Sequence, residues 1–219
     1  MGIVGAAIGL LGGSFDPTHN GHLQLARDAL KQLLLKEIRF IPAAQPWQKG
    51  PMTAAEHRAR MVQLAIAGEP RFALDMHEIE RGGVTYTIDT LHVLRQQFPE
   101  RPLVLIMGSD QFARLDTWRD WKEIVGAAHI AVAQRARASL QPGPDLQAVV
   151  DARRGQAADL ATRTGGSIVE FEMTPVDASA TEVRSLLGEA PSTERAQRLS
   201  AMVPALVLDY IDSHHLYRN

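Results

Sequence analysis

Apolar stretches of two kinds alternate along the chain, and together they predict alternating strands and helices. Continuous apolar runs are typical of buried strands, and they occupy residues 3–11, 38–42, 72–74, 103–107, 129–133 and 168–173. Helices are predicted over residues 23–35, 53–67, 87–98, 118–125, 145–162, 181–187 and 204–217. Strands that alternate with helices predict an α/β fold in which helices cover both faces of a parallel sheet.

Turn-forming residues separate these elements, and one helix has a recognisable start. Residues 43–52 are rich in Pro, Gln and Gly, and residues 142–144 read Pro-Gly-Pro, so both segments predict connections. Thr53, with Glu56 three residues later, predicts a capping box at the start of the second helix. We therefore expect this helix from its start signal as well as from its spacing.

Two adjacent glycines and two histidines stand between the first predicted strand and the first helix. Gly12 and Gly13 lack a Cβ, so a phosphate can approach their main chain closely. The unpaired N–H groups at a helix start favour anions, and His19 and His22 would share one helix face beside them. The pattern indicates a phosphate-handling site, although an ordinary strand–helix turn with two solvated histidines would share these features.

Two later turns carry residues that suit the same kind of ligand. Gly108 and Asp110 follow a central strand, and ligands of open parallel sheets lie at the carboxyl ends of strands. Asp110, at the end of this strand, would cap the following helix or recognise a hydroxyl group rather than a phosphate. Ser179, Thr181 and Arg184 surround a helix start, where they would form a polyphosphate clamp or an ordinary helix cap.

Composition restricts the class of protein. The chain has 219 residues, 45% hydrophobic and 22% charged, so we expect one domain, 1–219, with a substantial core. The net charge of −2 argues against a broad nucleic-acid-binding surface. Cysteine is absent, which excludes thiol chemistry and fits a reducing cytoplasm. We expect no signal peptide, and no apolar run approaches the roughly 20 residues of a membrane span.

The string Gly-Gly-Ser-Phe-Asp-Pro-Thr-His-Asn-Gly-His at residues 12–22 resembles the signature of the nucleotidyltransferase superfamily. The resemblance implies a Rossmann-like doubly wound parallel sheet with a small C-terminal helical portion, about 178–219. The superfamily's (I/S)SxTxxR element is matched by Ser179, Thr181 and Arg184, whereas Ala180 replaces its middle Ser. The implied ATP-binding residues are Gly12, Gly13, Ser14, Phe15, Gly21, Gly108, Asp110, Arg135, Ser179 and Thr181.

Further segments resemble the bacterial nicotinate mononucleotide adenylyltransferase family. They are residues 86–91 (YTIDTL), 108–110 (GSD), 115–118 (LDTW) and 210–217. The resemblance implies that Trp118 stacks on the pyridine ring, that amides near Thr87, Ile88 and Arg119 receive its carboxylate, and that Asp110 binds a ribose hydroxyl. Trp121 is expected to be the core aromatic. The implied substrate-binding residues are Lys49, Tyr86, Thr87, Ile88, Trp118 and Arg119.

The chain departs from this family in two loops. Residues 45–49 read Gln-Pro-Trp-Gln-Lys where family members often carry Pro-Pro-His-Lys. Residues 134–137 read Gln-Arg-Ala-Arg where members often carry Arg-Pro-Gly. Lys49 and Arg135 are the expected substitutes for the missing contacts.

The resemblance implies transfer of the adenylyl group of ATP to nicotinate mononucleotide, giving deamido-NAD and pyrophosphate in NAD biosynthesis. The catalytic residues would be His22 at the α-phosphate, His19 beside the polyphosphate, and Arg184 with Ser179 and Thr181 at the β- and γ-phosphates. Mg²⁺ would bind through the ATP phosphates, without a dedicated protein metal site. We expect a cytoplasmic monomer or small homo-oligomer with no nucleic-acid or membrane partner.

Other functions share part of this pattern. A sibling transferase acting on nicotinamide mononucleotide, on phosphopantetheine or with CTP would carry the same first motif. A non-catalytic nucleotide sensor would bind ATP without releasing pyrophosphate. A class I aminoacyl-tRNA synthetase fragment is disfavoured, since the sequence has neither a KMSKS-like string nor a basic face for tRNA. An oxidoreductase is disfavoured because no GxGxxG motif follows a predicted strand.

Overall fold

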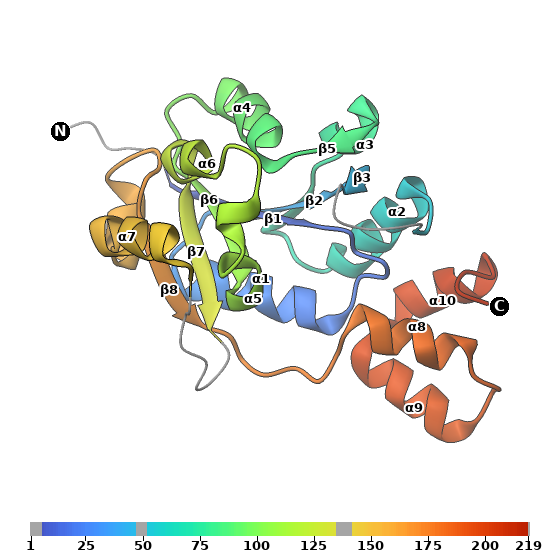
Figure 1. Ribbon diagram of the computed structural model, residues 1–219. Helices are drawn as coiled ribbons and strands as arrows, with labels where there is room; N and C mark the ends of the chain where they lie inside the picture. Colours follow the sequence, from blue (N-terminus) through green and yellow to red (C-terminus); the bar gives the residue numbers. More distant parts are fainter. Residues whose placement is uncertain (1–5, 47–51, 135–141, 219) are drawn as a thin grey trace.

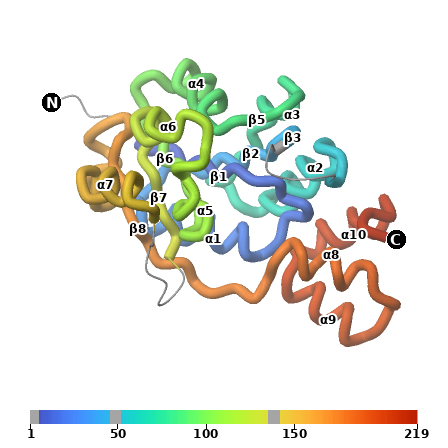
Figure 2. The backbone as a smooth tube through the Cα atoms, in the orientation of Figure 1, coloured from blue at the N-terminus to red at the C-terminus, as the bar shows by residue number. Residues whose placement is uncertain are grey.

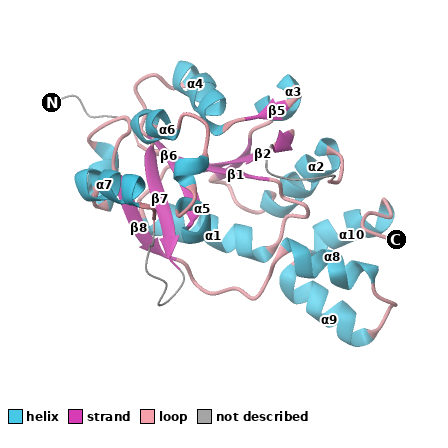
Figure 3. Cartoon of the chain, viewed as in Figure 1, coloured by secondary structure: helices cyan, strands magenta, loops and turns pink. Residues whose placement is uncertain are grey.

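A parallel sheet forms the centre of the fold in this computed structural model, which describes residues 6–46, 52–134 and 142–218. Across these ranges the main sheet has six strands in the order β4-β2-β1-β6-β7-β8 (Figure 1, Figure 3). They are β1 Ile8–Gly13, β2 Glu37–Pro42, β4 Phe72–Leu74, β6 Leu103–Gly108, β7 His129–Gln134 and β8 Ile168–Glu172. All neighbouring pairs are parallel, and the strand order reverses between β1 and β6. Such a reversal opens a crevice at the carboxyl ends of the two strands.

Alternate strand residues supply hydrophobic clusters on opposite faces of the sheet. Leu10 belongs to one cluster and Leu11 to the other, as the two-residue period of a strand requires. The face that includes Leu11 is covered by α1 Asn20–Gln32, α2 Ala55–Ile66 and η2 Ala157–Ala161. The opposite face is covered by α4 Thr87–Gln97, α5 Ser109–Phe112, η1 Leu115–Thr117, α6 Trp121–Ala127 and α7 Pro144–Arg153. This doubly wound arrangement confirms the predicted fold class.

Three helices gather at one end of the molecule, joined to β8 by an extended segment (Figure 1, Figure 2). They are α8 Ala180–Gly188, α9 Thr193–Met202 and α10 Ala205–Ser213. Their apolar faces form a third cluster, which also contains Met61 of α2. Met61 therefore connects the helical portion to the layer that covers the sheet. No helix in the described ranges is long and apolar enough to cross a membrane.

Small elements between β2 and β6 were not expected from the sequence. They are β3 Gln45–Pro46, α3 His77–Arg81 and β5 Val84–Thr85, and β3 pairs with β5 in a second, two-stranded parallel sheet. Each is too short to show a hydrophobic period, which explains why the pattern along the chain did not predict them. Helix α9 was missed as well, although Ser192 caps its start by accepting a hydrogen bond from the Arg195 amide.

Several predicted boundaries are wrong at the start of an element. Strand β1 begins at Ile8 rather than at residue 3; residues 1–5 lie outside the described part. Helix α1 begins at Asn20, so His22 lies in its first turn as expected, whereas His19 is the N-cap and precedes the first helical residue. The helix predicted over 118–125 begins only at Trp121, because Trp118 has an extended backbone and Asp120 is left-handed, with a φ of 52°.

The capping box predicted for α2 is also wrong. Ala54 is the N-cap of this helix, and it makes no side-chain capping hydrogen bond. The Arg58 Nε atom donates to the Thr53 carbonyl at 2.8 Å, so the chain before the helix is held by a buried guanidinium instead.

Three predicted helices end early, the first of them at Gln32 rather than at residue 35. The segment 145–162 breaks after Arg153, since Arg154 turns extended and pairs with Ile168 of β8 while the Gly155 amide donates to the Ile168 carbonyl. The segment 204–217 leaves the helical form after Ser213.

Candidate active site

The bend after β1 brings two imidazoles together at the start of α1. His19 is the N-cap of the helix, and its ring centroid lies 3.8 Å from that of His22. The His22 Nδ1 atom accepts a 3.3 Å hydrogen bond from the His19 main-chain N–H, which assigns the proton of a neutral His22 ring to Nε2. Buried Phe15 packs edge-on against the His22 ring at 5.0 Å.

His19 is nearly inaccessible, and this determines its charge. Only 8% of the residue is exposed, and the His19 Nδ1 atom has no hydrogen-bond partner among the described residues. Burial lowers the pKa of His19 from its usual 6.5 to about 4. The ring is therefore neutral at pH 7 and offers an N–H group rather than a positive charge.

Three glycines shape the space around the histidines. A Cβ on Gly21 would lie 3.0 Å from the His19 ring and 3.3 Å from the Ala178 carbonyl, so only glycine lets these groups approach. A Cβ on Gly108 would lie 2.6 Å from the Asp110 carboxylate. A Cβ on Gly12 would meet nothing within 4 Å, so the main chain there borders open space that a ligand can enter.

The bend before α8 adjoins the bend before α1. Ser179 is the N-cap of α8, and its Oγ atom accepts a 3.2 Å hydrogen bond from the Glu182 amide. Arg184 donates through Nη1 to the main-chain carbonyl of Asp16 at 2.6 Å and through Nη2 to Thr181 Oγ1 at 3.5 Å. The two motifs that the sequence suggested as phosphate clamps therefore face one another.

One cavity, of about 240 Å³, lies between these bends and the end of β6. The residues that line it include His19, Gly21, His22, Gly108, Asp110 and Ser179. Its polar groups are imidazoles, hydroxyls and main-chain groups around a helix start, with one exposed carboxylate at its edge. Such a lining suits a polyphosphate bound near a sugar.

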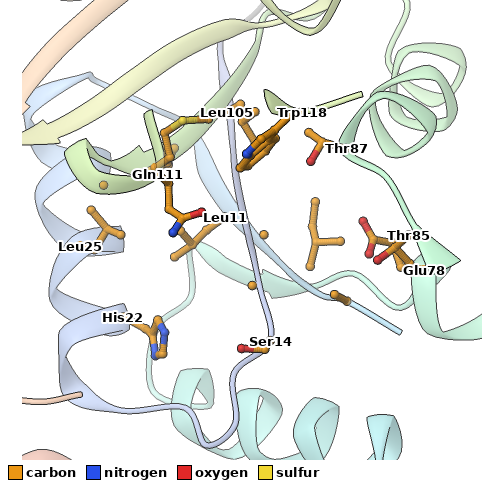
Figure 4. A pocket seen from close by; sticks show the side chains of 17 residues that line it. Leu11, Ser14, His22, Leu25, Glu78, Thr85, Thr87, Leu105, Gln111 and Trp118 are labelled. Carbon is orange, nitrogen blue, oxygen red and sulfur yellow. The ribbon is translucent and has the colours of Figure 1, made fainter. Parts of the chain in front are cut away.

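A second cavity, of about 360 Å³, extends from His22 across the carboxyl ends of β1 and β6 (Figure 4). Gly12, Gly13 and Ser14 line one side, and Trp118 and Thr87 line the far end. The figure shows the flat Trp118 ring beside Thr87, with Glu78 and Thr85 on the same side as Thr87 and His22 on the opposite side. An aromatic face beside a helix start fits a flat ring that carries a negative group.

Glu78, Thr85 and Gln111 also line this second cavity, although no sequence motif pointed to them. Glu78 is buried and accepts a hydrogen bond from the Thr90 hydroxyl. Burial raises the pKa of the Glu78 carboxyl, although the Thr90 hydrogen bond works in the opposite direction. Glu78 escaped notice because α3, the helix that carries it, has no pattern of its own.

Six of the predicted site residues that the structure describes line neither cavity: Phe15, Tyr86, Ile88, Arg119, Thr181 and Arg184. The side chains of Phe15 and Ile88 are buried in the core, so a ligand can contact only the main-chain atoms of these two residues. Arg119 is exposed and lies over the Tyr86 ring at 4.9 Å. Trp121 is partly buried and packs against the same core cluster as Trp118, but it lines neither cavity. Lys49 and Arg135 lie outside the described residues.

Comparison with known proteins identifies the family. A family model described as cytidylyltransferase-like matches residues 10–186. A probable nicotinate-nucleotide adenylyltransferase of Dechloromonas aromatica is 42% identical over 97% of this chain and 98% of its own length. Another of Pseudomonas aeruginosa is 37% identical over 98% of this chain and 99% of its own. This chain belongs to the nicotinate-nucleotide adenylyltransferase family.

Solved structures share the fold of this nucleotidyltransferase. A Plasmodium falciparum nicotinic acid mononucleotide adenylyltransferase complexed with NaAD aligns with a TM-score of 0.74 at 17% identity, covering 97% of this chain and 98% of that one. A putative nicotinate-nucleotide adenylyltransferase of Vibrio parahaemolyticus aligns with a TM-score of 0.65 at 14% identity, covering 98% and 97%. The family model and the relatives at 37–42% identity confirm the family resemblance and the predicted enzyme class, and the solved structures confirm the fold.

Proposed function

We propose that this enzyme transfers the adenylyl group of ATP to nicotinate mononucleotide, giving deamido-NAD and pyrophosphate in NAD biosynthesis. One observation carries the proposal: His22 and Gly108 line both cavities. ATP in the cavity beside Ser179 and a mononucleotide in the cavity beside Trp118 would therefore meet at His22. The family of the chain supports the same reaction.

In the proposed step, a phosphate oxygen of the mononucleotide attacks the α-phosphorus of ATP in line, and pyrophosphate leaves. The attacking phosphate is already ionised near neutral pH, so the step requires positioning and charge stabilisation rather than a strong base. His22 would donate from Nε2 to the α-phosphate, where negative charge builds. His19, neutral because of its burial, would donate an N–H to the neighbouring polyphosphate.

The bend before α8 would hold the leaving group. Arg184 uses one N–H on the Asp16 carbonyl and one on Thr181, so its guanidinium retains further donors for the β- and γ-phosphates. The Ser179 oxygen accepts from the Glu182 amide, which leaves its hydroxyl proton for a phosphate oxygen. The amides near Gly12, Gly13 and Ser14 line the larger cavity beside His22, where the two cavities meet, and from there they would complete the ATP side together with Arg135 and with Phe15 packed beneath.

The mononucleotide would occupy the Trp118 end of the larger cavity. Trp118 would stack on the pyridine ring, and the main chain of Thr87, Ile88 and Arg119 would receive its carboxylate. Tyr86 and Lys49 would border this end. On the ATP side, Asp110 in the smaller cavity would bind a ribose hydroxyl of the nucleotide.

Mg²⁺ would reach the site on ATP. The described residues contain no group of three or more His, Cys, Asp or Glu side chains that could hold a metal ion. Imidazoles, hydroxyls and a guanidinium suit phosphate oxygens better than a hard cation. The ion would be held by the triphosphate and by water, and it would neutralise part of the phosphate charge.

We propose further that residues 1–219 act as a single nucleotidyltransferase domain with a helical portion from about 178 to 219. The contribution of Met61 to the third hydrophobic cluster supports this, as does the Arg184–Asp16 hydrogen bond. A cytoplasmic monomer or small homo-oligomer is the assembly we expect from the sequence.

An acceptor screen tests the function. Pyrophosphate release is measured with Mg²⁺ and ATP in the presence of nicotinate mononucleotide, nicotinamide mononucleotide or phosphopantetheine. We expect the highest kcat/KM with nicotinate mononucleotide. Preference for another acceptor would identify a sibling transferase, and ATP binding without pyrophosphate release from any acceptor would indicate a nucleotide sensor.

A further inference from the structure

We propose that Tyr217 is a positioning residue for the segment that carries His19 and His22 (residues 14–22, here called the histidine bend). Tyr217 holds this segment through the side chain of Asp16. The Tyr217 hydroxyl donates a 2.6 Å hydrogen bond to Asp16 Oδ1 across 201 positions of sequence. Asp16 stands three residues before His19 and is only 6% exposed. The inference rests on the proposed roles of His19 and His22.

The chain after α10 is folded so as to deliver this hydroxyl. His215 has a φ of 52° and Tyr217 a φ of 61°, left-handed conformations that non-glycine residues seldom adopt. The Leu216 amide donates to the Ile211 carbonyl at 3.0 Å, which turns the segment back along its own helix. A strained backbone conformation persists only where the surrounding structure holds it, and residues in such conformations cluster at functional sites.

The histidine bend receives hydrogen bonds from distant parts of the chain on two sides. From one side, buried Arg58 donates to the Ser14 carbonyl at 2.7 Å. From the helical portion, Arg184 donates to the Asp16 carbonyl at 2.6 Å. Asn20 in turn donates to the Ala201 carbonyl at 2.7 Å. Each of these three hydrogen bonds is accepted by a main-chain carbonyl, whereas the Tyr217 hydroxyl donates to the side chain of Asp16.

The Tyr217–Asp16 contact is of a strong type. A hydroxyl that donates to a carboxylate forms a charge-assisted hydrogen bond, which is stronger than a neutral one. Burial and the neighbouring Asp16 carboxylate raise the pKa of Tyr217, so the hydroxyl keeps its proton and remains a donor. Loss of the donor would leave a buried carboxylate short of a partner and would loosen the backbone that sets the position of His19.

Catalysis should respond more than substrate binding. A displacement of about 1 Å in a catalytic group can lower a rate by about a hundredfold. The Tyr217 hydroxyl donates its hydrogen bond to Asp16, and neither residue lines either of the two cavities described above, so we expect neither to contact the substrates. Removal of the Tyr217 hydroxyl should therefore lower kcat while both KM values stay nearly constant.

The matched pair of variants is Tyr217→Phe and Tyr210→Phe. Tyr210 also belongs to the helical portion, and its hydroxyl lies 2.8 Å from His57 Nδ1, away from the bend. For Tyr217→Phe we expect kcat to fall roughly tenfold, with the KM values for ATP and mononucleotide within about twofold of the parent. Tyr210→Phe should keep kcat within about twofold, and equal losses in both variants would overturn the proposal.

A double-mutant cycle with Asp16→Ala tests the route of the effect. If Tyr217 acts through Asp16, the double variant should be no slower than the slower single variant, within about twofold. Losses in kcat that multiply would overturn the proposal. Should Asp16→Ala not fold, as thermal unfolding will tell, the comparison of the two tyrosine variants decides alone.

Parent turnover with nicotinate mononucleotide is measured first in the same series. Its absence would contradict the proposed function and with it the role of Tyr217. Parent turnover together with an unimpaired Tyr217→Phe variant would contradict only the positioning role.

Discussion

Arg184 donates a 2.6 Å hydrogen bond to the main-chain carbonyl of Asp16, across 168 positions of sequence. This contact joins the bend before α8 to the bend that carries His19 and His22. Both bends line the smaller cavity, and His22 also lines the larger one. The arrangement allows two phosphate-bearing ligands to meet at one imidazole, which is what adenylyl transfer requires.

Replacing His22 should reduce turnover without unfolding the protein. We expect His22→Ala to lower kcat by about 10²–10³, since one preorganised donor at the charged α-phosphate is lost. His92→Ala is the control, because His92 is exposed, pairs with Glu123 at 2.7 Å and lines neither cavity. Steady-state rates give the comparison, and near-parent turnover by His22→Ala would remove this residue from the mechanism.

Replacing Trp118 should weaken binding of the mononucleotide. Stacking of an aromatic ring contributes about 0.5–1.5 kcal/mol, so Trp118→Ala should raise the KM for nicotinate mononucleotide by roughly two- to tenfold. Trp121→Ala is the matched control, since Trp121 lies outside both cavities. A KM change confined to ATP would contradict the placement of the pyridine ring.

Replacing Arg184 should affect the ATP side. Hydrogen bonds to charged groups contribute about 1.5–3 kcal/mol, so Arg184→Gln should lower kcat/KM for ATP by about 10- to 150-fold. Arg198→Gln is the comparison, because Arg198 is exposed and pairs with Glu182 of α8 at 2.8 Å. The assignment would be wrong if the two variants behaved alike under subsaturating ATP.

Acid should destabilise the protein partly through His19. Its pKa is lowered to about 4 when folded, whereas an unfolded histidine titrates near 6.5. Between these values the unfolded chain binds the additional proton, so the free energy of unfolding falls as the pH falls. The His19 contribution is present in full above pH 6.5 and is lost progressively towards pH 4.

Urea denaturation of the parent and of His19→Gln between pH 7 and pH 4.5 measures this contribution. The variant should show a slope smaller by up to about 1.4 kcal/mol per pH unit. Buried His129, whose pKa is also lowered by burial, acts in the same direction in both proteins. If the free energy of unfolding had the same pH dependence in both proteins, His19 would not be held in its neutral form by burial.

Features that depend on local pattern could be predicted from the sequence. The central strands have continuous apolar runs because both faces of the sheet are covered, and this determined the fold class. Gly12, Gly13, His19 and His22 occur in one short string, so their proximity follows from spacing alone.

Features that depend on tertiary contacts could not be predicted in this way. The contact of Tyr217 with Asp16 requires two left-handed residues after α10, which no local signal announces. Thr53 resembles a helix cap, yet the Arg58 guanidinium binds its carbonyl and the helix starts later. Glu78 lies on a helix of five residues, where no period can develop.

The fate of the α-phosphate of ATP tests the central claim most directly. The enzyme is incubated with Mg²⁺, nicotinate mononucleotide and ATP labelled at either the α- or the γ-phosphate, and the products are separated. We predict that the α-label appears in deamido-NAD and the γ-label in pyrophosphate. Transfer of the γ-label to the mononucleotide, or an α-label that stays with AMP or ADP, would contradict adenylyl transfer at His22.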